Sequence, residues 1–542
     1  MYNSTKTRSR VARAAFVALL MSSVATATLA APATSRDAKL QAMQQQLDEM
    51  RTQMEQMRAQ SGQSEQLTQL QQQLAAFGQQ LSDMKAAQDA AASDIITLKT
   101  PTGSTVIPSL PNGKPMLATA DGRFTANIRA IVMLDAGAYL QKDNLPSTIT
   151  GAAAHLNDGT NFRRARFGID GKLFKDFDYG LIYEFGGSGA EDTGHIQEAW
   201  AQYNGLKPVR IKLGAFEPNI GLSAATSTSQ MVFMERPSSA EIARGVAAGD
   251  SRSALQIASN GIFGEGDSGL AARWFVSGAI TGNTVGTFNS AASSFNVQPF
   301  GEQEAVIGRV AIAPFASTDW QAHLGANIQY VARPNDNTGG TANPRFPVQL
   351  RDRPELRIDG ARLIDTGAID ARHVTVYGGE GAFGFRNFSV EGEYFKYKID
   401  RRQATATANL GDPDFDGWYV QGAWVITGES RPYNPTEARF DAPKMAYNFN
   451  PAAGTWGAWE LGARYSDTNL NWNDGAAGRA TPTGGIRGGE QKIATVGLNW
   501  YLNPDMRFML DYSHVEIDRL TGTGADQGQK FNTIALRSQL TF

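Results

Sequence analysis

Alternation of apolar and polar residues dominates the chain from about residue 120 to its end. In the closing stretch FNTIALRSQLTF, the even positions from Ile534 to Phe542 are mostly apolar and the odd positions are mostly polar. A period of two is typical of a β-strand with one apolar and one polar face. The pattern recurs in WQAHLGANIQYV (320–331) and ATVGLNWYL (494–502), between clusters of Gly, Asn, Asp and Pro.

The polar faces of these segments are too rich in charges and amides to pack as a protein interior. Aromatic residues gather at the ends of the apolar faces, as at a lipid–water boundary. Both features indicate a transmembrane barrel with lipid outside and water inside. We therefore predict an all-β fold, a transmembrane antiparallel β-barrel over residues 120–542. Its sixteen strands begin near residues 123, 162, 177, 195, 209, 254, 270, 305, 320, 372, 387, 416, 457, 490, 506 and 531.

The connections alternate between short turns and long loops, as expected for such a barrel with both ends on one side. One connection, residues 429–455, is long where a short turn is expected, so the strand count is least secure there. The segment 355–364 could form an extra strand, and we place it in a loop. Long loops are predicted at 141–161, 217–253, 282–302, 333–371, 400–415, 471–489 and 519–530.

A different periodicity precedes the barrel. Residues 37–99 are rich in Gln and Met, with apolar residues three and four positions apart. This heptad spacing predicts a coiled coil with a register break at 61–64, and hence oligomerisation. A partly helical polar linker is the alternative. Residues 100–119 contain helix-breaking Pro and Gly and are predicted to form a linker.

The first thirty residues resemble a secretory signal, with four basic residues before a short apolar run. Removing residues 1–30 lowers the formal net charge from -3 to -7, because the segment holds four basic and no acidic residues. An acidic secreted chain is a poor nucleic-acid binder, so no nucleic-acid partner is predicted. The chain has no Cys, which excludes disulfides and thiolate metal sites.

Three stretches resemble the phosphate-selective porin O and P family. They are FRRARFGIDGKLFKDFDYGLIYEFG (162–186), the segment from EAWAQYNGLKP to MERPSSAEI (198–242), and ITGESRPY with WGAWELGARYSDTNLN (426–473). The resemblance implies a sixteen-stranded, usually trimeric porin whose third outer loop folds inward and narrows the pore. Here that loop is 217–253, which we name the constriction loop. The C-terminal Phe542 matches the residue by which the assembly machinery recognises such barrels.

The resemblance also implies a ladder of Arg along the channel, with Lys at the constriction. Arg suits phosphate because its planar guanidinium binds oxyanions by charge-assisted hydrogen bonds. The constriction loop departs from the pattern, because it has four acids, three Arg and no Lys. Strict alternation would turn Arg163 outward. The candidate pore-lining and anion-binding residues are Arg164, Arg166, Arg210, Lys212, Arg236, Arg244, Arg252, Arg273 and Arg309.

Catalytic and metal motifs are not found in the sequence. The five His show no HExxH spacing, and no G-x-S-x-G motif stands at a strand–helix turn. Glu391 and Glu393 share a polar strand face, as lumen acids commonly do. The Asp-rich GDPDFDG (411–417) lacks the spacing of an EF-hand loop. We predict no enzyme activity, no catalytic residue, no metal and no cofactor.

The sequence therefore predicts a porin in the outer membrane of a Gram-negative bacterium, with the coiled coil in the periplasm. Its expected partners are small anions such as phosphate or polyphosphate, outer-membrane lipid and two further copies of the chain in a homotrimer. The alternative is a trimeric structural protein that tethers the outer membrane to the cell wall and has a general, non-selective pore.

Overall fold

The computed structural model describes residues 98–99, 105–111, 114–141, 155–187, 194–249, 251–263, 272–285, 302–317, 319–335, 347–402 and 410–542. The chain divides into two compact units, Met1–Ile96 and Thr97–Phe542. The first unit lies outside the described residues, so the signal segment and residues 37–97 of the predicted coiled coil remain predictions. None of the described helices is both long and apolar enough to cross a membrane.

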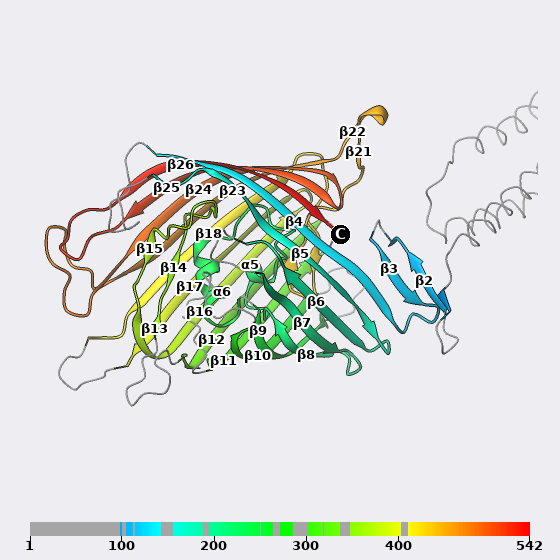
Figure 1. Cartoon of the computed structure of the whole chain (residues 1–542), viewed down its shortest axis with the longest axis horizontal. Coiled ribbons are helices and arrows are strands. Elements are labelled where there is room, and N and C mark those ends of the chain that lie inside the picture. The colour runs from blue at the N-terminus through cyan, green and yellow to red at the C-terminus, as the bar shows by residue number, and fades with distance from the viewer. Residues whose placement is uncertain are drawn as a thin grey trace, which may run out of the picture. The chain divides into compact units, whose positions relative to one another are not determined.

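Sixteen strands of the described residues form a closed antiparallel barrel, which confirms the predicted fold (Figure 1). Each strand pairs with its neighbour along the chain, and β26 closes the ring on β4. They are β4 (Thr125–Leu140), β5 (Gly159–Leu173), β6 (Phe177–Glu184), β7 (His195–Tyr203), β8 (Val209–Phe216), β9 (Arg252–Phe263), β10 (Ala272–Thr284), β11 (Glu304–Ala316), β12 (Trp320–Arg333), β16 (Ile369–Phe385), β17 (Phe388–Arg401), β18 (Asp414–Val425), β23 (Ala458–Trp472), β24 (Ile486–Asn503), β25 (Met506–Asp518) and β26 (Gln529–Thr541).

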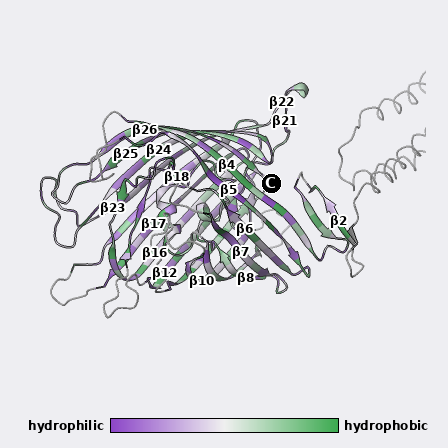
Figure 2. Ribbon diagram, in the orientation of Figure 1, coloured by the Kyte–Doolittle hydropathy of each residue, from purple (hydrophilic) through white to green (hydrophobic). Residues whose placement is uncertain are grey.

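The strands alternate in hydropathy along their length, as the sequence predicts (Figure 2). Apolar side chains such as Leu536 are exposed on the outside of the barrel, and polar side chains such as Arg537 and Gln539 are buried in the lumen. Aromatic pairs mark one end of the barrel, the end that carries the short turns, which we name the turn end. The pairs have ring centroids 4.3–6.0 Å apart. They are Phe177–Tyr203, Phe263–Trp274, Trp320–Phe385, Phe388–Trp424 and Trp459–Trp500. These rings form the girdle expected at a lipid–water boundary.

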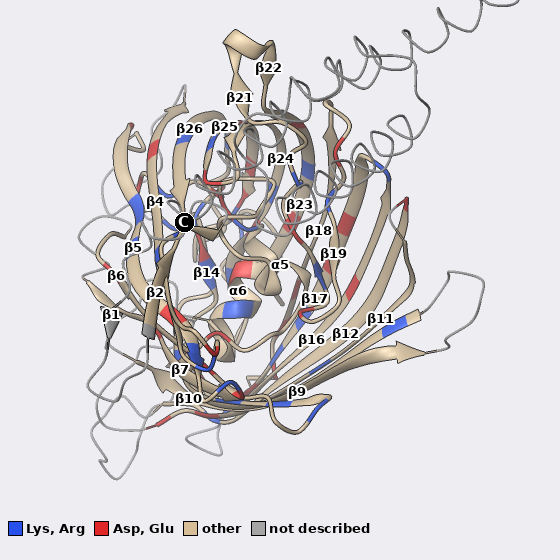
Figure 3. Cartoon of the chain, turned by 90° about the vertical axis from the view of Figure 1, so that its right-hand side faces the viewer, with Lys and Arg blue, Asp and Glu red and all other residues tan. Residues whose placement is uncertain are grey.

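Two loops from the opposite end fold into the barrel. The constriction loop contains α5 (Leu222–Ala225) and α6 (Ser238–Ala247), and both helices lie inside the ring of strands (Figure 3). The second loop, residues 347–368, which we name the bracing loop, contains β13 (Pro347–Val348), β14 (Arg351–Asp352) and β15 (Ile364–Asp365). Residues 355–364 form no barrel strand, and only Ile364 enters a strand, the two-residue β15, so the placement of this segment in a loop is confirmed.

The long connection at the turn end, residues 426–457, is real, and it does not disturb the strand count. We name it the inner connection. It forms two small hairpins, β19 (Tyr433–Asn434) with β20 (Arg439–Phe440), and β21 (Phe449–Asn450) with β22 (Thr455–Trp456) around the 3-10 turn η3 (Pro451–Ala453). The barrel strands on either side of it, β18 and β23, still pair directly.

The segment before the barrel differs from the prediction. β1 (Leu98–Lys99), β2 (Thr105–Ser109) and β3 (Met116–Thr119) form an antiparallel ladder whose last strand pairs with the start of β4. The predicted linker 100–119 therefore contains the two strands β2 and β3. The predicted helix is wrong at its last two residues, Leu98 and Lys99, which form β1. The start of β4 offers a free edge here, because β26 pairs with β4 only from Ile131 onward, and a free edge recruits strands.

Candidate functional site

The constriction loop is held in the lumen by polar side chains of the barrel wall that bind its backbone. Glu393 of β17 accepts hydrogen bonds from the N–H groups of Leu222 and Ser223 at 2.9 and 3.0 Å. Asp511 of β25 accepts the N–H of Met234 at 2.9 Å. Further bonds join Arg507 to Met231 O, Asn499 to Val232 O, Gln539 to Ser229 O, Gln329 to Ala243 O and Tyr397 to Ser239 O. The loop therefore replaces water as the hydrogen-bonding partner of much of the lumen wall.

Glycines on the lumen side of the strands make this close approach possible. A Cβ atom at Gly462 of β23 would lie 2.7 Å from Cγ1 of Val232. A Cβ at Gly417 of β18 would lie 2.8 Å from Cβ of Ser239 in α6. Both distances are shorter than a van der Waals contact allows, so these positions require glycine. Glycine inside a strand was the one sequence signal of this docking.

The bracing loop fixes the constriction loop from the other side. Glu355 accepts the N–H of Ser238, the first residue of α6, at 2.9 Å, and it binds Arg464 of the wall at 2.5 Å. A carboxylate at a helix N-terminus satisfies otherwise unpaired N–H groups and the positive end of the helix dipole. Arg357 of the same loop forms an ion pair with Glu241 of α6 at 2.8 Å.

Glu235 of the constriction loop lies at the centre of a buried group of arginines. Its carboxylate is 2.8 Å from the guanidinium nitrogens of Arg163 and Arg537, 3.5 Å from Arg357 and 3.9 Å from Arg164. Burial by itself would raise the pKa of Glu235, but these four cations hold it well below its usual range. Glu235 is therefore an anion that cancels part of the positive charge gathered around it.

Arg163 points into the lumen, which corrects the outward orientation expected from strict alternation. The register between β4 and β5 shifts at this point, since Met133 faces Arg164 while Leu134 faces Phe162. Arg163 is the extra residue of this β-bulge. A bulge lets neighbouring side chains point to the same side of a strand, so Arg163 and Arg164 both reach Glu235.

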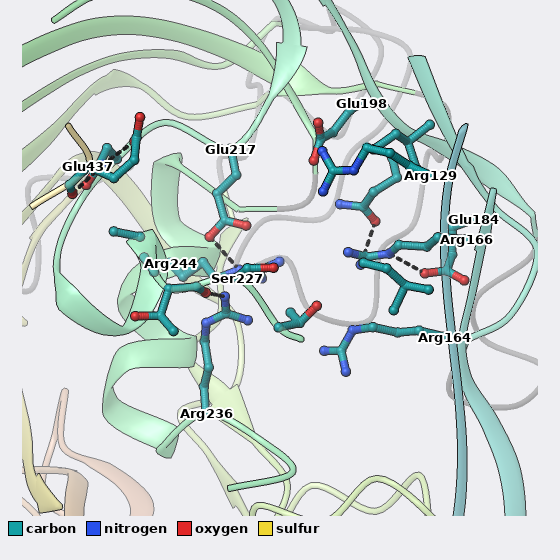
Figure 4. A pocket seen from close by; sticks show the side chains of 18 of the residues that line it. Arg129, Arg164, Arg166, Glu184, Glu198, Glu217, Ser227, Arg236, Arg244 and Glu437 are labelled. Carbon is teal, nitrogen blue, oxygen red and sulfur yellow. Dashed lines mark hydrogen bonds and ion pairs between the residues drawn. The ribbon is translucent and has the colours of Figure 1, made fainter. Parts of the chain in front are cut away.

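An open cavity of about 320 Å³ remains between the constriction loop and the wall formed by β4–β9. Its described lining includes ten basic and five acidic side chains. The basic residues are Arg129, Arg163, Arg164, Arg166, Arg210, Lys212, Arg236, Arg244, Arg357 and Arg439, and the acidic ones are Glu184, Glu198, Glu217, Glu241 and Glu437. Figure 4 shows Arg129, Arg164 and Arg166 across the cavity from Arg236 and Arg244, with Ser227 between them.

Six of the nine predicted residues line this cavity. They are Arg164, Arg166, Arg210, Lys212, Arg236 and Arg244. Arg166 forms an ion pair with Glu184 at 2.7 Å, Arg210 with Glu437 at 3.1 Å and Arg244 with Glu217 at 2.8 Å. Arg236 donates to the carbonyls of Ser223 and Thr226, and Nζ of Lys212 lies 4.0 Å from the ring centroid of Trp200.

The structure does not bring Arg252, Arg309 and Arg273 to the cavity. Arg252 is fully buried and donates to the carbonyls of Gly249 and Gly245, so it binds the C-terminal end of α6. Arg309 is buried against Glu380 at 2.8 Å and donates to Asn219, Glu437 O and Ala438 O. Both arginines join parts of the fold. Arg273 is only partly buried, near the turn end of β10.

Four cationic residues that line the cavity were not predicted from the sequence. They are Arg129, Arg163, Arg357 and Arg439. Arg357 and Arg439 belong to the bracing loop and the inner connection, and loop residues carry no alternation that would show an inward direction. Arg129 lies on β4 and forms an ion pair with Asp170 at 3.1 Å. Because Arg129 lies in a predicted strand, the alternation of that strand could have indicated that it points into the lumen.

The two lumen acids Glu391 and Glu393 form hydrogen bonds that hold the wall and the constriction loop together. Glu393 receives a hydrogen bond from Tyr419 as well as the two loop N–H groups, and Glu391 accepts one from Gln421 at 2.6 Å. Within the described residues, no group of three or more His, Asp or Glu side chains is arranged to hold a metal ion.

The chain is similar to several known proteins. The family described as phosphate-selective porin O and P matches residues 149–542. Porin O of Pseudomonas aeruginosa is 27% identical over 395 residues, which cover 69% of this chain and 81% of that protein. A loop-deletion mutant of the outer-membrane protein OmpT of Vibrio cholerae aligns at a TM-score of 0.42 and 10% identity, over 78% of this chain and 100% of that one. The outer-membrane channel DcaP of Acinetobacter baumannii aligns at 0.40 and 12% identity, over 77% and 97%.

Proposed function

Since the chain belongs to the phosphate-selective porin O and P family, we propose that its channel selects small anions, with phosphate and polyphosphate as the class of solute. Family membership makes the chain an outer-membrane porin. The anion preference rests on one observation, the excess of five positive charges around the lumen cavity. We propose no catalytic activity for this barrel.

The geometry of the cavity supports a preference of moderate strength. Fixed positive charges on a low-dielectric wall raise the local concentration of anions and repel cations. Most of the cavity arginines already have a carboxylate or carbonyl partner, so a passing anion competes with those partners. A solute is therefore attracted by the summed field without being trapped, as conduction requires. Phosphate is expected to reduce the chloride current only at high concentration.

Strand lengths support the proposal of a homotrimer. A strand needs about 9–11 residues to cross the membrane at a tilt of 45°. β6 and β8 have eight residues each and β7 has nine, whereas β24 has eighteen. The wall formed by β6–β8 is therefore too short to span the hydrocarbon core of the membrane fully by itself. We propose that β6–β8 face the neighbouring subunits of the trimer.

We further propose that the turn end, which carries both ends of the barrel domain, faces the periplasm of a Gram-negative bacterium. Residues 1–30 would then direct export, and residues 37–97 would form a coiled coil in the periplasm. The support for these two segments is their sequence pattern alone.

The test is the reversal potential of the full-length protein in planar bilayers across a potassium chloride gradient. We expect an anion-preferring potential that moves toward zero selectivity in the double variant Arg164→Ala with Arg166→Ala, because two fixed charges leave the wall. The matched control is Arg386→Ala, since Arg386 lies in an exposed short turn. The control should keep the native potential. A cation-preferring native protein, or equal potentials in all three proteins, would overturn the anion assignment.

A further inference from the structure

The second half of the inner connection leaves the lumen and stands out from the barrel wall at the turn end. Residues 447–457, which we name the rim hairpin, comprise β21, the 3-10 turn η3 and β22. Figure 1 shows this arm projecting beyond the strands beside it. No charged residue occurs between Lys444 and Glu460, which is unusual for a surface arm of a chain with 19% charged residues.

The rim hairpin is joined to the aromatic girdle of the barrel. Phe449 packs edge-on against Trp500 of β24 at 5.3 Å and against Trp456 at 5.7 Å. The indole N–H of Trp500 donates to the carbonyl of Trp456 at 2.8 Å. Trp500 in turn stacks on Trp459 of β23 at 5.1 Å. The hairpin is therefore a sideways continuation of the girdle, held by aromatic contacts and one hydrogen bond.

Its outer surface is aromatic and uncovered. Tyr447 and Trp456 are 70% and 59% exposed, and the tip Pro451–Gly454 is exposed along its length. Large aromatic side chains in contact with water are unfavourable, so such a surface marks an interaction site. Trp and Tyr are the residues that favour the headgroup level of a bilayer, where the ring is in apolar surroundings and its polar atom in water.

We propose that the rim hairpin is a membrane anchor that inserts Tyr447, Trp456 and its uncharged tip into the headgroup region of the phospholipid leaflet at the turn end. Continuity with the girdle sets the depth, because Trp459 and Trp500 already lie at that boundary. A second copy of the chain is the other conceivable occupant. It is disfavoured because four strands, β25, β26, β4 and β5, separate β24 from β6, the nearest of the short strands proposed for the subunit contact.

The anchor would hold the barrel at one side, at the level of the lipid headgroups. It fixes the height of β23–β25 relative to one leaflet and resists tilting, as interfacial aromatics do for other membrane segments. This inference rests on the barrel lying in a membrane but not on the anion selectivity of its lumen.

The chain has no Cys, so single cysteines can be spin-labelled specifically. Ala453→Cys and Trp456→Cys report on the tip and the aromatic face. Asp319→Cys is the control, in a short turn of the same end where the side chain is 61% exposed. The full-length variants are reconstituted in vesicles of phosphatidylcholine and phosphatidylglycerol. The measurement compares collision of each label with oxygen, which concentrates in lipid, and with a water-soluble nickel chelate.

We expect the oxygen-to-nickel ratio to be several-fold higher at positions 453 and 456 than at 319. Equal ratios at all three positions would overturn the anchor in favour of a hairpin in water. Labels at 453 and 456 that are immobile and shielded from both reagents would overturn it in favour of protein contact. Conductance of the same preparations keeps the two proposals apart, since loss of anion selectivity leaves these ratios unchanged.

Discussion

At the scale of single residues, buried charges in the lumen divide into those that face the cavity and those that hold the loops. Arg309 and Arg252 donate to backbone carbonyls and show no surface to the cavity. Arg164 and Arg166 border the cavity with their ion-pair partners at the edge. An arginine on a polar strand face is therefore a pore residue only where the loops leave space beside it. The sequence contains no information about that space.

Asp352 of the bracing loop gives a prediction about pH. Burial, with a smaller contribution from Glu241, raises the pKa of Asp352 to about 6 in spite of Arg357. An unfolded Asp titrates near 3.9, so the protonated form favours the folded state. Its stabilising effect is complete below pH 4 and is lost as the pH rises through about 6, a change of about 3 kcal/mol.

Asp352→Asn should therefore raise the temperature at which the barrel loses its fast-migrating folded form on gels at pH 8, and should leave it unchanged at pH 4. Glu355→Gln is the control, because Glu355 has direct ion-pair and helix contacts and its loss should destabilise at both values. An Asp352→Asn variant that is less stable than the native protein at pH 8 would contradict the assignment.

At the scale of elements, the lumen is shaped by loops that enter from both ends of the barrel. The constriction loop and the bracing loop enter from one end, and the first half of the inner connection enters from the other. The constriction loop and the inner connection meet where Arg309 of β11 contacts Asn219 of the first and Glu437 and Ala438 of the second. The open cavity is thereby left on the side of β4–β9, because the loops pack against the opposite wall.

Glu393 tests how firmly the constriction loop is docked. Its carboxylate accepts two loop N–H groups and the hydroxyl of Tyr419. Each such hydrogen bond contributes about 0.5–1.5 kcal/mol. Glu393→Ala should loosen the start of the loop and give larger current fluctuations in single-channel recordings. Glu391→Ala is the control, because Glu391 lies two residues away and accepts a hydrogen bond from Gln421 of the wall. This variant should show current fluctuations as small as those of the native protein. Similar noise in both variants would argue against the docking role.

The heptads of residues 37–97 give a second prediction at this scale. A peptide of this segment should be helical and self-associated, because its apolar seam has no other surface to bury against. Replacing Leu74 and Leu81 by Asp should abolish the association in analytical ultracentrifugation. A monomeric, non-helical native peptide would show that the spacing is incidental.

At the scale of the whole molecule, Phe542 takes part in closing the ring of strands. The N–H of Phe542 donates to the carbonyl of Ala130 at 3.0 Å, and the N–H of Ala130 donates to the carbonyl of Phe542 at 2.8 Å. Phe542 thus adds the last pair of backbone bonds between β26 and β4. A barrel has no free edge only when this seam is complete.

Deleting Phe542 should slow the appearance of the folded, heat-modifiable species in outer membranes, because it removes two hydrogen bonds of the seam between β26 and β4. The conductance of molecules that do fold should stay native, since Phe542 does not line the cavity. Phe542→Tyr should assemble at close to the native rate. A deletion that folds as fast as the native chain would argue against a role for this residue in assembly.

The sequence by itself determined the barrel, its sixteen strands and the inward side of most of them. The reason is physical. A strand between lipid and water must alternate apolar and polar residues, and this alternation can be read along the sequence. Glu391 and Glu393 were placed on a lumen face in this way, as were Arg164 and Arg166. The long constriction loop and the long inner connection could also be located from the spacing of the strands.

Only the tertiary structure decided which lumen residues reach the passage. Loops have no periodic constraint, so the inward course of the bracing loop and the inner connection, with Arg357 and Arg439, could not be seen in the chain. The bulge at Arg163 and the burial of Arg309 depend on register and on packing between segments far apart in sequence. Selectivity belongs to the space left between wall and loops, and that space exists only once the loops are docked.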